Sequence, residues 1–282
     1  MKTGMNLLLW GTEITEEHDS VLEELKGIGF DAVEVPIFNV DDIKPYERLR
    51  GRLEALGLGA TAVTVMGADT NPISPDSAIR RAAVEHFNKV LDCAAAFGCE
   101  ILCGPIHSAI GVFSGNGPTD DEFKYGVDTM RQMAENGQVR KVRLAAEYLN
   151  RFEIYFLTTA SDTARYVNAV DHPNLRMMYD SFHAHIEEKD QAIAISSCSK
   201  ETIHVHISEN DRGIPGTGQV DWDGVFTGLK TSGYDGYLTI EAFGRALPAL
   251  AAATKVWRDL FPDRMDLCRQ GLSFMKARAG LA

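Results

Sequence analysis

Four residues of metal-binding type stand at matching places in the chain. Glu147, Asp180, His206 and Glu241 each lie at or near the end of a short apolar segment: RLAAEY, LRMMYD, IHVHIS and YLTIEA. They are 33, 26 and 35 residues apart, about one strand-helix unit each time. Three carboxylates close together in a dry pocket require a counter-cation. Oxygen and imidazole ligands suit Mn²⁺, Co²⁺ or a similar divalent ion, so the pattern predicts one metal site.

Each of these residues taken alone has an ordinary alternative. A carboxylate at the end of a strand often caps a helix or joins a salt bridge. The recurrence of the four at equivalent places on four successive segments favours the metal interpretation. If the segments are neighbouring parallel strands, their ends meet on one rim and the side chains converge.

The elements that would position these residues follow a simple alternation. Short apolar runs rich in β-branched residues suit strands of a parallel sheet covered by helices. Strands are predicted at 5–10, 32–37, 60–66, 100–106, 143–148, 175–180, 203–208 and 237–242. Amphipathic runs between them predict helices near 16–27, 41–56, 74–97, 121–139, 160–170, 187–200, 221–231, 247–258 and 263–278.

Glycines mark repeated junctions between these helices and strands. Gly29, Gly57, Gly98 and Gly233 each follow a helical run, where glycine adopts the left-handed conformation that ends a helix. Thr15 and the Ser74–Pro75 pair are predicted to begin helices. Eight such units without a linker predict an α/β fold, a (β/α)8 TIM barrel, as a single domain over residues 1–282.

Further candidates surround the predicted metal site. His183 follows Asp180 by three residues and could bond a substrate oxygen; Arg212 lies in the long loop 209–220 and could bond sugar hydroxyls. His204 shares a strand face with His206 but lies deeper, where we expect a supporting role. The ordinary alternatives are a capping or core histidine and a surface arginine. An apolar wall for the carbon face of a sugar is expected from Trp10, Met66 and Phe113, with a place in the core as the alternative for Met66.

Composition limits the partners. The formal net charge of −12 argues against nucleic acid and against an anionic membrane surface, since both are bound through Lys and Arg. The five cysteines form no C-x-x-C pair, so we expect reduced, buried thiols and a cytoplasmic protein. We find no signal-peptide pattern and no stretch long enough to span a membrane.

With these residues in view, the sequence resembles the D-tagatose 3-epimerase family. The segments AAEYLNRFE, MYDSFHAHIEE, HVHISENDRGIPGTGQVDW and LTIEAF carry the likeness, which extends over nearly the whole chain. The family includes D-psicose (allulose) and L-ribulose 3-epimerases within the xylose-isomerase-like barrels. The resemblance implies a Mn²⁺ site, with Co²⁺ or Mg²⁺ as alternatives, free ketoses as substrates, and a homodimer or homotetramer.

The resemblance also implies roles for particular residues. Glu147 and Glu241 would be both metal ligands and the acid/base pair, while Glu153, His183 and Arg212 would contact substrate. One glutamate would remove the C3 proton of an open-chain ketose, and the other would return a proton to the opposite face of a cis-enediolate.

Other functions remain open on the same residues. Aldose–ketose isomerisation, hydroxypyruvate isomerisation and inosose dehydration also need a metal and carboxylates. A DNA-repair endonuclease would need more histidines and a basic groove, and a non-catalytic sugar-binding module would not need the glutamate pair.

Overall fold

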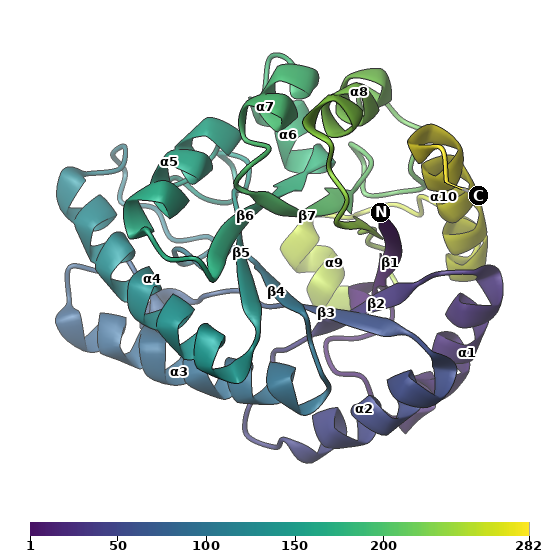
Figure 1. Ribbon diagram of the computed structural model, residues 1–282, viewed down its shortest axis with the longest axis horizontal. Coiled ribbons are helices and arrows are strands. Elements are labelled where there is room, and N and C mark those ends of the chain that lie inside the picture. The colour runs from purple at the N-terminus through teal and green to yellow at the C-terminus, as the bar shows by residue number, and fades with distance from the viewer. Residues whose placement is uncertain (282) are drawn as a thin grey trace.

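Eight parallel strands close into a barrel in chain order, β1 to β8 with β8 pairing back to β1 (Figure 1). The computed structural model describes residues 1–281; Ala282, the last residue of the predicted domain, lies outside them. The strands are β1 (Lys2–Asn6), β2 (Ala32–Pro36), β3 (Gly59–Val63), β4 (Ile101–Gly104), β5 (Arg143–Glu147), β6 (Leu175–Asp180), β7 (Thr202–Ile207) and β8 (Tyr237–Ile240). The predicted (β/α)8 barrel is confirmed.

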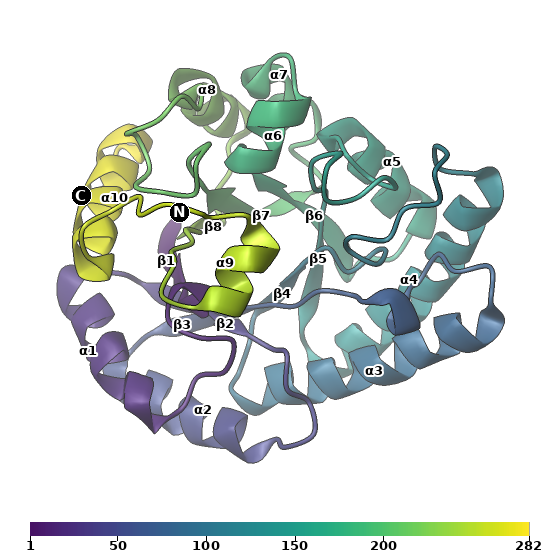
Figure 2. The ribbon, with the colours of Figure 1, turned by 180° about the vertical axis from the view of Figure 1, so that it is seen from behind.

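Helices form a ring outside the strands (Figure 1). They are α1 (Asp19–Ile28), α2 (Lys44–Leu56), α3 (Ser77–Ala96), α4 (Asp120–Arg140), α5 (Ala160–Val170), α6 (Ser181–Glu187), α7 (Gln191–Ser197), α8 (Trp222–Ser232), α9 (Pro248–Thr254) and α10 (Arg264–Ala279). Figure 2 shows that α9 is an exception, since it lies across one end of the barrel. No helix in residues 1–281 is long and apolar enough to cross a membrane.

Several boundaries differ from the sequence prediction. The first strand ends at Asn6, because the Asn6 side chain accepts a hydrogen bond from the Leu8 amide and begins a 3₁₀ turn at Leu7–Leu9. The helix predicted near 187–200 is the shorter α7, and α6 before it was not predicted. Helix α3 begins later than Ser74–Pro75, because Asp76 is the residue that caps it.

The glycine junctions behave as predicted. Gly29, Gly57, Gly98 and Gly233 all have positive φ, between 62° and 109°. Each lets the chain turn from a helix into the next strand at little steric cost. The residue at which the next strand begins then determines which of its side chains face the barrel interior and which face the helices.

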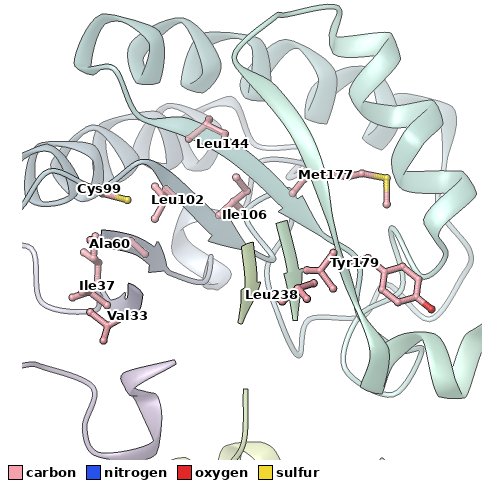
Figure 3. Packing of buried hydrophobic residues seen from close by; sticks show 14 of the residues in the cluster. Val33, Ile37, Ala60, Cys99, Leu102, Ile106, Leu144, Met177, Tyr179 and Leu238 are labelled. Atoms are coloured by element: carbon pink, nitrogen blue, oxygen red, sulfur yellow. The ribbon is translucent and has the colours of Figure 1, made fainter. Parts of the chain in front are cut away.

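Apolar packing occurs in two layers. The larger cluster lies between the strands and the surrounding helices and includes Val33, Leu102, Leu144 and Leu238 (Figure 3). The smaller one includes the strand residues Ala32, Cys103, Ala145, Met178 and Tyr237, which alternate with the first set. Alternation with a period of two assigns these residues to the barrel interior, the same face as Glu34, Glu147, Asp180 and His206.

Candidate metal and substrate site

The four predicted metal ligands meet at the C-terminal rim of the strands. Glu147, Asp180, His206 and Glu241 each offer a ligand atom, and these atoms all lie within 4.8 Å of one another. Asp180 pairs directly with His206 in the register of β6 and β7. All four side chains are buried, and Asp180 and His206 are fully so. A buried His/Glu/Asp cluster that could hold a metal ion is therefore present.

The orientation of His206 suits a metal ligand. Its Nε2 lies 2.7 Å from Glu34 Oε1. Its Nδ1 is buried and has no hydrogen-bond partner among the described residues. This nitrogen lies 3.6 Å from both Asp180 Oδ2 and Glu241 Oε1. A ring that donates through one nitrogen and points the other at two carboxylates is the arrangement that metal-binding histidines use.

Electrostatics at the rim favour a cation. Burial raises the pKa of Glu147 well above its usual range, and the neighbouring Glu241 and Asp180 raise it further. Burial alone would also raise the pKa of Asp180, but Arg212 reverses this and lowers it. For His206, burial opposes the charged ring, yet Glu34 and Glu241 raise its pKa well above 6.5. The residues present fit a divalent cation, whose charge would let all three carboxylates ionise.

Arg212 lies beside the quartet. Its Nη1 donates to Glu241 Oε2 at 2.8 Å and to Asp180 Oδ2 at 3.1 Å. Its guanidinium lies 3.7 Å from the centre of the Phe182 ring. Arg212 also has a φ of 65°, which is unfavourable for a side chain of this size. The surrounding loop therefore holds this residue in place against a local backbone cost.

Glu209 organises that loop. It is fully buried, and its carboxylate accepts hydrogen bonds from the Gly216 and Val220 amides and from Trp222 Nε1. No sequence pattern indicated Glu209, because a glutamate in a polar loop gives no sign that it is buried. Its role follows only from the chain folding back over residues 209–220.

His183 and Glu153 face the same space. His183 Nδ1 accepts from the Asn150 amide at 3.0 Å, so the ring proton of the neutral form lies on Nε2. Burial lowers the pKa of His183 to about 3, which keeps the ring neutral. Arg212 Nη2 lies 3.1 Å from that Nε2. Two N–H groups, on His183 Nε2 and Arg212 Nη2, cannot form a hydrogen bond with each other. An oxygen of a ligand could accept a hydrogen bond from both.

Glu153 lies next to this pair. Asn150 Nδ2 donates to its Oε1 at 2.7 Å. Burial raises its pKa, although the Arg212 charge and the Asn150 hydrogen bond partly offset this. The backbone and side chain of Asn150 thus orient both His183 and Glu153, a link that no sequence motif indicated.

A cavity of about 190 Å³ opens onto these groups. Glu147, Glu153, His183, Arg212 and Glu241 form its polar part. The apolar part includes residues from the barrel rim and from α9: Leu8, Phe38, Val63, Val65, Pro105, Ile110, Leu149, Phe243, Leu250 and Ala253. Helix α9 therefore contributes the roof of the cavity, in agreement with its position across the barrel end (Figure 2).

The three residues predicted to form an apolar wall lie elsewhere. Trp10 is buried beside a different surface hollow, with Gly244, Leu260 and Phe261. Met66 is fully buried in the main core. Phe113 is about half exposed and lies 6.2 Å from the Tyr155 ring, centre to centre. None of the three is among the described residues that line the cavity.

A second buried cluster of possible metal-binding residues lies on the inner face of the barrel. It comprises Glu34, Cys103, His204 and the shared His206. His204 Nε2 lies 2.7 Å from Glu34 Oε2, which places His204 in the supporting position expected for it. Glu34 was missed, although a charged residue within the apolar strand AVEVP was an available signal.

Comparison with known proteins agrees with this geometry. Residues 22–278 match the family model of the xylose isomerase-like TIM barrel. A probable ketose 3-epimerase of Synechocystis sp. is 29% identical over 98% of this chain and 96% of its own length. An L-ribulose 3-epimerase of Methylomonas sp. is 30% identical over 89% of this chain and 87% of its own.

A solved structure shows a similar fold over nearly the whole chain. The crystal structure of a D-allulose 3-epimerase from Methylomonas sp. in complex with D-allulose superposes with a TM-score of 0.92. It has 27% sequence identity and covers 99% of this chain and 97% of that one. The agreement of fold, rim geometry and full-length similarity shows that this chain belongs to the xylose isomerase-like TIM barrel family and is similar to its ketose 3-epimerases.

Proposed function

We propose that this protein is a metal-dependent epimerase that inverts C3 of a free ketose. The observation that carries this proposal is the placement of Glu147 and Glu241, which lie on β5 and just after β8, with β6 and β7 between them, and line one cavity. Inversion requires a proton to leave one face of a carbon and another to arrive at the opposite face. Two carboxylates that approach one cavity from different parts of the rim meet that requirement.

Different residues would transfer the protons, bind the substrate and hold the metal. One glutamate removes the C3 proton and the other donates a proton to the opposite face, and their roles exchange with the direction of reaction. His183 and Arg212 donate to oxygens of the substrate, and Glu153 accepts from a hydroxyl. Glu147, Asp180, His206 and Glu241 would hold the metal, which when bound acts as a Lewis acid that acidifies the proton next to the carbonyl.

The metal and the substrate are proposed as follows. Mn²⁺ suits three carboxylates and one imidazole, with Co²⁺ or Mg²⁺ as substitutes. The substrate is a ketose of the D-tagatose, D-fructose, D-psicose or L-ribulose type, in line with the names of the relatives and the sugars in their solved structures. Free, buried cysteines fit a cytoplasmic protein. We expect a single-domain chain that assembles as a homodimer or homotetramer.

A panel of free ketoses tests the proposal. Each sugar is incubated with the protein and Mn²⁺ in D2O, and the product is analysed for stereochemistry and for the position of deuterium. A C3 epimer labelled at C3 is the expected product. Transfer of hydrogen between C1 and C2 would instead show an aldose–ketose isomerase. Full activity after exhaustive chelation would contradict the metal-dependent mechanism.

A further inference from the structure

The Glu34 carboxylate is the centre of a hydrogen-bond cluster inside the barrel. It is fully buried. Its Oε1 accepts from Asn6 Nδ2 at 2.9 Å and faces His206 Nε2 at 2.7 Å. Its Oε2 accepts from Thr61 Oγ1 at 2.9 Å and faces Cys103 Sγ at 3.3 Å and His204 Nε2 at 2.7 Å. Five side chains from four other strands, β1, β3, β4 and β7, thus converge on one carboxylate.

These contacts keep a charge inside the barrel. Within residues 1–281, no lysine or arginine forms an ion pair with Glu34, so hydrogen-bond donors and histidines alone satisfy it. A carboxylate that accepts several hydrogen bonds is stabilised in its ionised form. Glu34 contacts the Nε2 side of the His206 ring, while Asp180 and Glu241 of the quartet lie near its Nδ1 side.

The same contact determines which nitrogen of His206 is available. Because Glu34 can only accept, His206 Nε2 carries the proton that bonds it. When Nδ1 is deprotonated, its lone pair faces the space between Asp180 and Glu241, 3.6 Å from each. A ring in the other tautomer, or turned over, would face the quartet with the wrong group.

The cluster could also be considered as a second metal site, since Glu34, Cys103, His204 and His206 have suitable types. The contacts favour hydrogen bonding. The two short histidine contacts involve different oxygens of Glu34. If Nδ1 of His206 serves the metal quartet, a second ion at Nε2 would require the ring to lose its other proton as well. His206 Nε2 forms a hydrogen bond with Glu34 Oε1, whereas His204 Nε2 lies close to Oε2 without hydrogen-bond geometry among the described residues.

We propose that Glu34 is a positioning residue for the metal centre: by accepting the Nε2 proton of His206 it fixes the tautomer and orientation of the ring and makes Nδ1 a stronger metal ligand. This rests on the proposed metal quartet. Loss of such a supporting contact usually lowers metal affinity by about 10- to 100-fold. Asn6 extends the effect, because its Nδ2 donates both to Glu34 and to Glu241 Oε1, at 3.0 Å.

The test measures Mn²⁺ affinity directly. The full-length protein is titrated with Mn²⁺, and free Mn²⁺ is followed by its electron paramagnetic resonance signal. Glu34→Leu removes the acceptor and is expected to weaken binding by about 10- to 100-fold. Glu34→Gln keeps an amide oxygen that can face His206 and is expected to lie between Glu34→Leu and wild type. Thr61→Val is the matched control, because it removes a different donor to the same carboxylate, leaves the His206 contact in place, and should change the affinity far less than Glu34→Leu does.

Thermal unfolding in chelator separates positioning from a general loss of structure. A purely structural role would lower the melting temperature of the metal-free protein and leave Mn²⁺ affinity of the folded variant unchanged; that result would overturn the proposal. So would two Mn²⁺ bound per wild-type chain with one lost in Glu34→Gln. If Glu34→Leu does not fold, the ordering of Glu34→Gln and Thr61→Val decides. A wild-type protein that binds no Mn²⁺ would contradict the proposed function itself.

Discussion

Glu241→Gln separates the two duties assigned to Glu241. The amide has nearly the same shape, so it can keep an oxygen toward Asn6 Nδ2 or Arg212 Nη1, which bond the carboxylate at 3.0 and 2.8 Å. It cannot take up a proton. If the reaction uses one carboxylate on each face of C3, the variant retains Glu147 and can still exchange the proton on one face, but it cannot complete the inversion.

The expected magnitude follows from the role of a single base. A positioned general acid or base usually contributes about 10²- to 10⁴-fold to the rate. This corresponds to about 3 to 5 kcal/mol of transition-state stabilisation. We therefore expect the rate of epimerisation to fall by at least about 100-fold. Exchange of the C3 hydrogen with solvent should fall much less for the epimer whose proton faces Glu147, and should be lost for the other epimer.

The assay follows both processes in one sample. Each C3 epimer is incubated in D2O with Mn²⁺, deuterium at C3 is measured by NMR, and the product epimer is quantified by chromatography. Glu147→Gln should give the mirror-image result, with exchange retained for the opposite epimer. Equal loss of exchange and inversion from both epimers would refute the two-base reasoning, as would epimerisation at the wild-type rate.

Metal loss is the alternative cause that must be controlled. Asp180→Asn removes one of the carboxylates proposed to hold the metal, and Asp180 has no proton-transfer role in the proposed mechanism. Its activity should recover, at least in part, as Mn²⁺ is raised. The activity of Glu241→Gln should not recover at Mn²⁺ concentrations that saturate its binding, because the missing base is not replaced by the ion.

Three further predictions concern other parts of the molecule. Arg212→Lys should raise KM by about 10-fold or more in steady-state kinetics, because lysine lacks the planar fork that stacks on Phe182 and bonds two carboxylates; an unchanged KM would contradict this role. Burial lowers the pKa of His107 to about 4. The unfolded chain therefore binds more protons below pH 6.5, and the free energy of unfolding should fall from there toward pH 4, by at most about 3 kcal/mol from this residue. Urea unfolding at several pH values should show a smaller decline for His107→Gln than for wild type. Gly104→Ala should destabilise by several kcal/mol in the same assay, since φ is 121° and an added Cβ would lie 2.1 Å from the Thr64 carbonyl oxygen; a stable variant would show that the backbone there can adjust.

Much of the candidate site could be predicted from local pattern. Glu147, Asp180 and His206 lie on apolar strands of five or six residues, and Glu241 directly follows another. Spacing of about one unit is enough to align strand ends once a barrel is assumed, because parallel strands in chain order share one rim. The glycine junctions, at Gly29 and Gly233 for example, also depend on local backbone sterics and were predicted correctly.

Contacts between residues far apart in the chain determine the features of the site that could not be predicted. Whether Trp10, Met66 and Phe113 reach the cavity depends on where loops from different units fold, and α9 supplies part of the cavity wall instead. The partners of Glu34 come from four other strands, and those of Glu209 from a loop folded back on itself. Sequence by itself determined the strand order and the four ligand types, because these follow from periodicity and residue chemistry. Only the tertiary structure decided which nitrogen of His206 faces the quartet and which side chains enclose the substrate, because those depend on contacts between residues far apart in the chain.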